Sequence, residues 1–335
     1  MSTEAAVPHE APHPPRRSRV AEAWLRYVDF LREREAPDAL ALGRIVFGLA
    51  VIANVLEQIF YTGVMELYGN PSAGGVFAFS GKAKYSLFAL VDPTPEAVWA
   101  VVLLTLIGGV TFTLGLFTRL SSLVLFVCHM TLMARMGWFN FSSDNVYRVF
   151  SFLMLISPVG AAWSLDAKWR GKGKPTVPMW PRRLLIAQLT IVYVKTGLMK
   201  VGSTWSIDDR WSALYYSLNL PYFAWFPGEW LASEYIYPFT QVATFVARWW
   251  ETLFFLVPLG LYLRRNPTSG GRLRRMLAAI DWRLVFMPVG VLLHASLVVV
   301  MKLGMFPFVM VSLYPFVMEP AEARRVLNRV FRRWL

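Results

Sequence analysis

The stretch ALALGRIVFGLAVIANVLEQIFYT, residues 39–62, carries only two charged residues, Arg44 and Glu57. An α-helix needs about 20 predominantly apolar residues to cross the hydrocarbon core of a bilayer. Inside that core the backbone polar groups must bond to one another, and a helix satisfies them within a single segment. The stretch therefore predicts a transmembrane helix. Because Arg44 lies near one end of it, we expect its side chain to reach out to the lipid headgroups.

Seven further apolar stretches follow, at residues 94–116, 119–137, 145–165, 182–201, 235–263, 283–302 and 304–319. The whole chain is 56% hydrophobic and 16% charged, whereas soluble domains are about a quarter charged. Its single cysteine, Cys128, excludes an intramolecular disulfide and a multi-cysteine metal site. We therefore predict an all-α protein, a polytopic transmembrane helical bundle of about eight spans.

The remaining segments complete the predicted organisation. Residues 1–19 are polar and proline-rich, which is typical of a disordered tail. In residues 20–36, apolar side chains recur at helical spacing beside arginines, so we expect an amphipathic helix on the membrane surface. The transmembrane domain takes residues 37–320. Residues 321–335 read as a basic amphipathic helix that anchors to the lipid leaflet and does not bind nucleic acid.

Lysine and arginine are distributed unevenly between the two sides that eight spans define. Of the 34 basic residues, 24 lie in the N-terminal segment, after the second, fourth and sixth spans, and in the C-terminal tail. Eight crossings place all of these on one side, and cytoplasmic loops carry the excess of basic residues in membrane proteins. Both termini are therefore predicted to be cytoplasmic, in a plasma membrane such as the bacterial inner membrane.

Charged and polar side chains within the spans indicate where function resides, because burying them in hydrocarbon is costly. Asp144 and Arg148 are spaced i, i+4, which predicts an ion pair on one helix face. The spans that carry Lys200, Glu251 and His294 direct polar groups into the outer half of the bundle. We therefore predict a pocket that opens to the non-cytoplasmic side.

Each of these residues also has a structural interpretation. Asp144 with Arg148 can be a contact between helices, Lys200 can reach the nearby interface, and His294 can be a hydrogen-bonded packing residue. The charge pattern alone leaves these alternatives open.

Four sequence segments resemble the integral-membrane part of vitamin K-dependent γ-glutamyl carboxylases. They are LGRIVFGL (42–49), SSDNVYRVFSFLMLISPVGAAWSLD (142–166), QLTIVYVKTGLMKVGSTW (188–205) and HASLVVVMKLGMFPFVM (294–310). Their order and spacing are similar to those of the broader HTTM family of membrane domains related to this carboxylase.

The resemblance implies that Lys200 is a catalytic base acting on a reduced naphthoquinone, with O2 and CO2 as co-substrates and no metal. It further implies that His294 is catalytic, binding a quinone oxygen or stabilising negative charge. The surrounding substrate or quinone pocket is then expected to be lined by Tyr193, Asp144, Arg148, Trp205 and Glu251. Oxidation of the quinone would be coupled to carboxylation, or to another modification, of a substrate on the outer face.

Two departures from the carboxylases leave other functions open. Asp144 stands where the animal enzymes have a histidine, and the sequence lacks their extramembrane β-rich domain that holds the substrate. A separate substrate-binding protein or peptide is then an expected partner beside the lipid bilayer. The alternatives are a non-catalytic accessory factor for maturation or export of a peptide, and a transporter, for which the expected internal repeat is missing.

Overall fold

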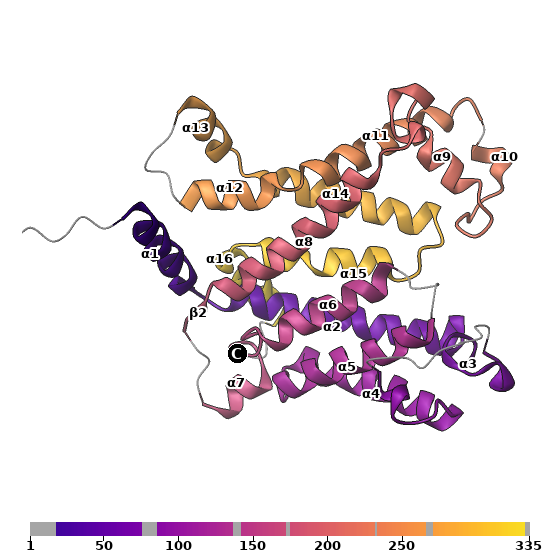
Figure 1. The fold of residues 1–335 in the computed structure, drawn as a ribbon, viewed down its shortest axis with the longest axis horizontal. Helices are drawn as coiled ribbons and strands as arrows, with labels where there is room; N and C mark the ends of the chain where they lie inside the picture. Colours follow the sequence, from indigo (N-terminus) through magenta and orange to yellow (C-terminus); the bar gives the residue numbers. More distant parts are fainter. Residues whose placement is uncertain are drawn as a thin grey trace, which may run out of the picture.

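The computed structural model describes residues 18–75, 86–136, 142–171, 175–231, 233–265 and 271–331. Most of these residues are helical (Figure 1). The strands β1 (Arg34–Glu35) and β2 (Val177–Pro178) form a short antiparallel pair in which Arg34 lies opposite Pro178. The predicted all-α fold is confirmed over this part of the chain. The predicted disordered tail lies outside the described residues as far as residue 17.

Four helices among the described residues are long and apolar enough to cross a membrane. They are α2 (Asp38–Glu57), which continues through a π-helical turn (Gln58–Thr62), α4 (Pro95–Leu114), α5 (Thr118–Met136) and α14 (Trp282–Val300). A fifth crossing forms if α11 (Tyr237–Leu253) and α12 (Leu256–Arg265), bent by 41° at their junction, span together. Figure 1 shows these helices running along a common direction.

The other predicted spans correspond to less regular segments. Helix α6 (Ser142–Leu155) has 14 residues, about 21 Å at 1.5 Å per residue, and turns containing Pro158 follow it. Helix α8 (Trp180–Met199) has 20 residues but carries two arginines, Arg182 and Arg183, in its first turn. Helix α15 (Phe306–Ser312) is short and is followed by the 3-10 turn η7 (Tyr314–Val317). Length and composition therefore support four or five spans, and the eight predicted ones are not confirmed.

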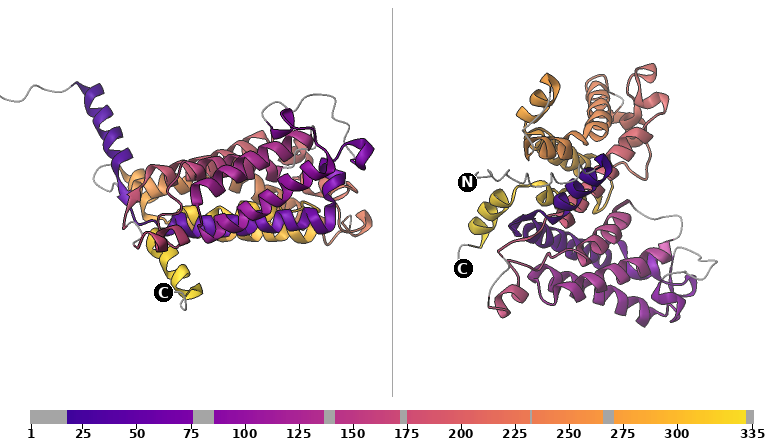
Figure 2. Two further views of the ribbon diagram at one scale, coloured as in Figure 1. Left: turned by 90° about the horizontal axis from the view of Figure 1, so that it is seen from below. Right: turned by 60° about the vertical axis from the view of Figure 1, so that its left-hand side comes forward.

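Helix α2 lies between the two halves of the bundle. One half holds α4, α5 and α6, and the other holds α8, α11, α12, α14 and α15, as the right-hand view of Figure 2 shows. Gly43 packs directly against the Phe316 ring, and a β-carbon on Gly48 would collide with Thr113 of α4. Because side chains are absent at both points, the neighbouring elements approach α2 closely on two faces.

The prediction that Arg44 reaches the headgroups is wrong. Its side chain is fully buried, with Nη1 3.2 Å from the carbonyl oxygen of Val159, and it also donates to the carbonyl oxygen of Trp163. Gly115 ends α4 with a φ of 69°, and a β-carbon there would collide with the guanidinium. Carbonyl groups buried in the turns after α6 need donors, because unpaired polar groups are costly in an apolar interior. Arg44 supplies these donors and holds the turns against α2.

Short elements gather at the two ends of the bundle. The basic end carries α1 (Arg19–Arg32), the β1–β2 pair, α7 (Leu165–Trp169), α13 (Arg272–Ala279) and α16 (Pro320–Val330). The opposite end carries α3 (Val64–Tyr68), α9 (Ala213–Leu218), α10 (Gly228–Leu231) and 3-10 turns at Pro71–Ala73, Leu87–Ala89, Ser203–Trp205 and Ile207–Asp209. The first and last described helices thus lie at the same end. In the left-hand view of Figure 2, both α1 and α16 turn away from the bundle axis.

Helix α16 is fixed to the bundle by polar and apolar contacts. Arg324 Nε lies 3.0 Å from Asp38 Oδ1, and Ala323 and Leu327 pack in a buried cluster with Ala39 of α2. The predicted leaflet anchor therefore uses one apolar face to contact the protein itself.

Asp281 joins α12 and α14 at the basic end. Its carboxylate caps the first turn of α14, lies 2.7 Å from Arg283 Nη2 and also pairs with Arg264. Hydrogen bonds from Arg283, and then from Arg264, lower the pKa of Asp281 to about 2 against the opposing effect of its partial burial.

Candidate functional site

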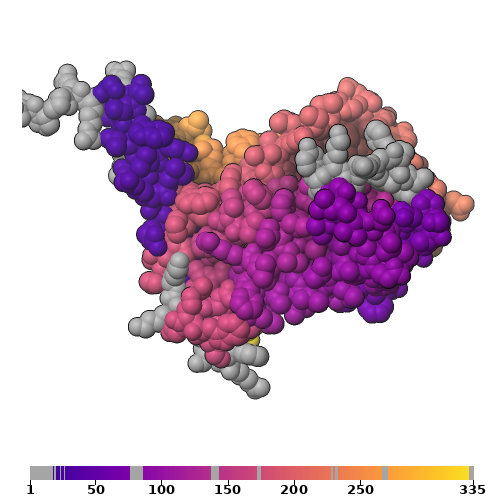
Figure 3. All heavy atoms as spheres, turned by 60° about the horizontal axis from the view of Figure 1, so that its bottom comes forward, coloured from indigo at the N-terminus to yellow at the C-terminus, as the bar shows by residue number. Residues whose placement is uncertain are grey.

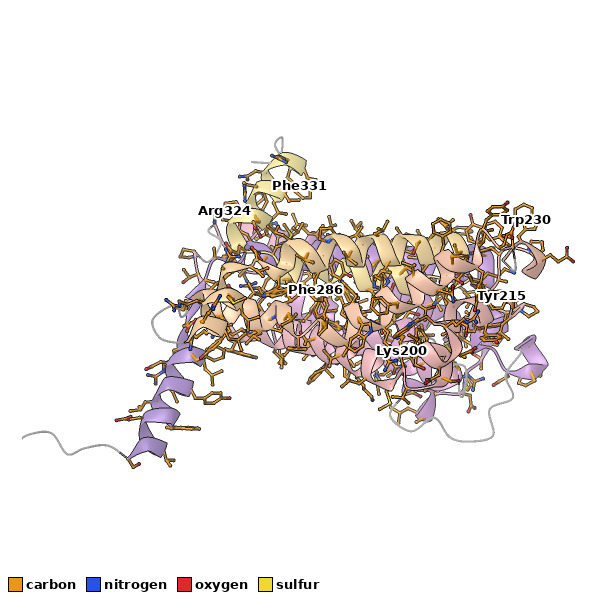
Figure 4. All side chains as sticks on the ribbon, turned by 90° about the horizontal axis from the view of Figure 1, so that it is seen from above. Lys200, Tyr215, Trp230, Phe286, Arg324 and Phe331 are labelled. Atoms are coloured by element: carbon orange, nitrogen blue, oxygen red, sulfur yellow. The ribbon has the colours of Figure 1, made fainter. Side chains whose placement is uncertain are left out.

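Lys200 follows the last residue of α8 and forms an ion pair with Glu251 of α11, which we call the lysine–glutamate pair. The two side chains are 14% and 18% exposed, so both are largely shielded. The Trp205 ring covers the amine, with 5.1 Å between Nζ and the ring centre. Figure 4 shows Lys200 between Phe286 and Tyr215 along the bundle, on the side away from Arg324. Three of the predicted site residues therefore lie together.

A close helix crossing makes this pair. Gly197 of α8 faces Thr252 of α11 so closely that a β-carbon on Gly197 would collide with the backbone nitrogen and hydroxyl of Thr252. Lys200 lies three residues after Gly197 and Glu251 directly precedes Thr252, so this crossing brings the two side chains together. Arg248, one turn before Thr252, donates to the carbonyl oxygen of Trp205 and fixes the turn that carries the covering ring. The amine is therefore held in place by Glu251 on one side and the Trp205 ring on another.

A buried network of hydrogen bonds lies about two turns earlier on α8, around Tyr193, and we call it the tyrosine–histidine network. The Tyr193 hydroxyl is 2.9 Å from His294 Nε2 and 3.0 Å from the Tyr314 hydroxyl. The three side chains come from α8, α14 and η7, and all are buried. Gly290, one turn before His294, makes room, because a β-carbon there would collide with the Tyr314 hydroxyl and the Trp250 ring. The network thus joins three segments that are distant in sequence.

The second ring nitrogen of His294 has a distinct environment. His294 Nδ1 is buried and has no hydrogen-bond partner among the described residues. Aromatic rings surround the network: Trp250 meets Tyr193 edge to face at 4.7 Å between centres, and Phe306 lies 5.9 Å from the imidazole. A buried nitrogen without a partner can accept or donate one further hydrogen bond to a group that enters this aromatic surrounding.

The lysine–glutamate pair and the tyrosine–histidine network are adjacent but separate. Tyr193 and Lys200 are seven residues apart, which is two turns and about 10 Å along α8. Trp250, which packs on Tyr193, directly precedes Glu251 in the chain. Proton-carrying groups from α8, α11, α14 and η7 therefore form two neighbouring sets in the second half of the bundle.

Asp144 and Arg148 do not join this region. Arg148 donates to the side-chain oxygen of Asn145 at 3.0 Å. Asp144 is buried and lines a small cavity together with Gln58 and His129, between α2, α5 and α6. Tyr147, one turn along α6, stacks on His129 and donates to the carbonyl of Ala50, which directs this helix face toward α2.

Several residues of the site carried little signal in the sequence. Tyr314 lies in an apolar stretch and its hydroxyl gives no periodicity, while Gly197 and Gly290 matter only through the close approaches they permit. For Tyr314, the sequence offers one clue: a polar hydroxyl directly before Pro315, near the end of the last apolar stretch. Over the described ranges, no three His, Cys, Asp or Glu side chains are grouped as metal ligands would be.

Residues 33–258 match the family model described as HTTM domain. The match covers about two-thirds of the chain and includes Tyr193, Lys200 and Glu251. His294 and Tyr314 lie beyond its end. No solved structure matches the chain.

Proposed function

Because the chain belongs to the HTTM domain family, a family of carboxylase-like membrane proteins, we propose that this integral membrane protein is a quinol-dependent oxygenase. It uses Lys200 as its base to modify, by carboxylation or a related reaction, a substrate reached from the outer face. The single observation that carries the proposal is the shielded lysine–glutamate pair beside the tyrosine–histidine network.

The proposed topology has eight crossings with both termini in the cytoplasm. It is supported by the position of α1 and α16 at the same end of the bundle, since an even number of crossings returns the chain to its starting side. The basic end also carries the arginines of α13 and α16, in keeping with the positive charge of cytoplasmic segments. The lysine–glutamate pair then lies toward the non-cytoplasmic side.

The lysine–glutamate pair supplies the proposed base. A lysine acts as a base only when its amine is neutral, and the Glu251 carboxylate is the acceptor that the Lys200 amine contacts. Trp205 covers the amine and limits its access to water.

The tyrosine–histidine network fits the hydrogen-bonding groups of a naphthohydroquinone. His294 Nδ1 is a buried nitrogen without a partner, and Trp250, Phe254 and Phe306 offer flat apolar surfaces nearby. His294 and Tyr193 would hold the polar oxygens, and the aromatic rings would contact the apolar part. When bound, the reduced quinone would supply the electrons for O2 and thereby the energy for removing a proton from a carbon acid. The residues themselves bind, orient and exchange protons.

The test is oxygen consumption by the full-length protein in lipid nanodiscs supplied with a chemically reduced naphthoquinone. We expect Lys200→Ala to lower the rate by a factor of about 10² or more, the usual contribution of a positioned base. Lys195→Ala removes an exposed amine from the same helix and is the matched control, which should keep the parent rate.

Two results would overturn the proposal. If the parent protein consumes no more oxygen than empty nanodiscs, the chain is not a quinol oxygenase, and the non-catalytic role in peptide maturation or export takes its place. If the parent is active and folded Lys200→Ala retains the full rate, the assignment of the base is wrong.

A further inference from the structure

A second recess lies at the basic end, between α1, α8 and α12, far along α8 from Lys200. Its volume is about 490 Å³, within the range of about 300–1,000 Å³ typical of ligand pockets. We call this recess the α1 groove. Its apolar wall comes from α1, the start of α8 and α12, and three arginines, Arg182, Arg183 and Arg265, lie in it. The apolar lining residues are Tyr27, Phe30, Leu31, Met179, Trp180, Leu184, Ile186, Ala187, Pro258, Leu261 and Tyr262. Figure 3 shows α1 standing off from the body of the molecule beside this region.

The wall of the α1 groove is mostly apolar, and its three cations differ in how they are paired. Arg182 is buried and binds Glu35 through two bonds of 2.6 Å. Arg183 pairs with Glu33 and lies over the Phe30 ring. Two of the three positive charges are therefore neutralised by partners on the segment that follows α1.

Arg265 is the cation with binding capacity left. Its Nη1 contacts the Met179 sulfur at 2.8 Å, and its Nη2 stays 3.9 Å from Glu35 Oε2, which already serves Arg182. A thioether is a weak acceptor, and 3.9 Å is beyond hydrogen-bond distance. Within the part of the chain that the structure describes, the guanidinium thus has no short bond to an oxygen, although its five N–H donors match two oxygens of a phosphate.

We propose that the α1 groove binds one anionic phospholipid, with its phosphate on Arg265 and an acyl chain along the apolar wall of α8 and α12. Charge complementarity favours this occupant, because the groove combines one excess positive charge with a long apolar surface. Basic recesses between membrane helices on the cytoplasmic side are known sites for anionic headgroups. The proposal rests on the membrane placement given above, which sets Arg265 at the headgroup level, and it is independent of any catalytic activity.

The experiment measures thermal unfolding of the full-length protein in neutral detergent while phosphatidylglycerol or phosphatidylcholine is added. We expect phosphatidylglycerol to raise the midpoint saturably and phosphatidylcholine to raise it much less. Arg265→Gln should weaken the apparent affinity for phosphatidylglycerol about tenfold, the loss expected for one charge-assisted bond. Arg272→Gln, which removes an exposed charge from α13 at the same end, should leave the affinity unchanged.

A second variant and a second ligand keep the test decisive. Ala187 is exposed in the wall of the groove, so Ala187→Trp fills it without altering the core or the charge, and should abolish the lipid effect even if Arg265→Gln does not fold. Inorganic phosphate alone should give no comparable rise. The proposal is overturned if phosphate matches the lipid, if phosphatidylcholine acts equally, or if Ala187→Trp binds phosphatidylglycerol like the parent. None of these readouts depends on quinol oxidation, so failure here is distinct from failure of the proposed enzyme.

Discussion

Removing the Tyr193 hydroxyl should destabilise the protein more than removing that of Tyr314, because the two hydroxyls have different numbers of partners. Tyr193→Phe breaks both bonds of the network and leaves His294 with no bond on either ring nitrogen. Tyr314→Phe breaks only the bond to Tyr193, which keeps its contact with His294. The exposed Tyr235, at 76% exposure, provides the matched control.

The magnitude follows from these bond counts. A neutral hydrogen bond contributes about 0.5–1.5 kcal/mol net, and a buried group left unpaired costs about 1–3 kcal/mol. Tyr193→Phe should therefore lower the free energy of unfolding by about 2–4 kcal/mol, and Tyr314→Phe by about 1 kcal/mol.

Reversible denaturation in mixed micelles, followed by tryptophan fluorescence, measures these differences. Tyr235→Phe should change the unfolding free energy by less than about 0.5 kcal/mol, as is usual at exposed positions. Equal losses for Tyr193→Phe and Tyr314→Phe would refute the reasoning, because the central position of Tyr193 would then have no energetic meaning. In the oxygen assay, Tyr193→Phe should also impair quinol oxidation more than Tyr314→Phe.

Three further predictions concern the scaffold. Asp281→Asn should cost about 2 kcal/mol of unfolding free energy at neutral pH, since a carboxyl pKa lowered from 3.8 to about 2 corresponds to that stabilisation. The stabilisation is present above about pH 4 and is lost as the pH falls toward 2, so the stabilities of parent and variant should converge in acid denaturation. Gly197→Leu should separate α8 from α11 at Thr252 and abolish quinol oxidation while the helix content by circular dichroism is retained; full activity would contradict the close crossing. Arg44→Met should lower the free energy of unfolding by about 2–4 kcal/mol in the same fluorescence titration, because two buried carbonyl groups lose their donors. An unchanged free energy of unfolding would show that these carbonyl groups find other partners.

The sequence predicted the class of fold because apolar stretches of about 20 residues admit few alternatives. It overestimated the regular length of the fourth stretch, where the helix ends at Leu155 and turns containing Pro158 follow. The sequence also led to the wrong position for the Arg44 side chain. The distance of a charged residue from the end of a span does not show whether a buried carbonyl group lies within its reach. Composition and periodicity report burial, and the partners of a buried charge depend on tertiary packing.

The candidate site was predicted in part for the same reason. Lys200, Glu251 and His294 were conspicuous as polar groups in apolar segments, and the structure places Glu251 on Lys200 and His294 on Tyr193. The grouping of Asp144 with them followed from its depth in the membrane alone. Depth does not specify the direction of a side chain around its helix, and Asp144 points to the other half of the bundle.

The contact of α2 with the last elements of the chain has a consequence for biogenesis. Gly43 receives the Phe316 ring and Asp38 receives Arg324, so α2 is completed by residues that the ribosome adds much later, 286 positions further along the chain in the case of Arg324. Until those residues are made, α2 stays in the bilayer with the Asp38 carboxylate not yet paired with Arg324 and its glycine surface at Gly43 uncovered. A nascent chain that stops early would keep these features exposed, and they are the kind of defect that a membrane quality-control protease can detect.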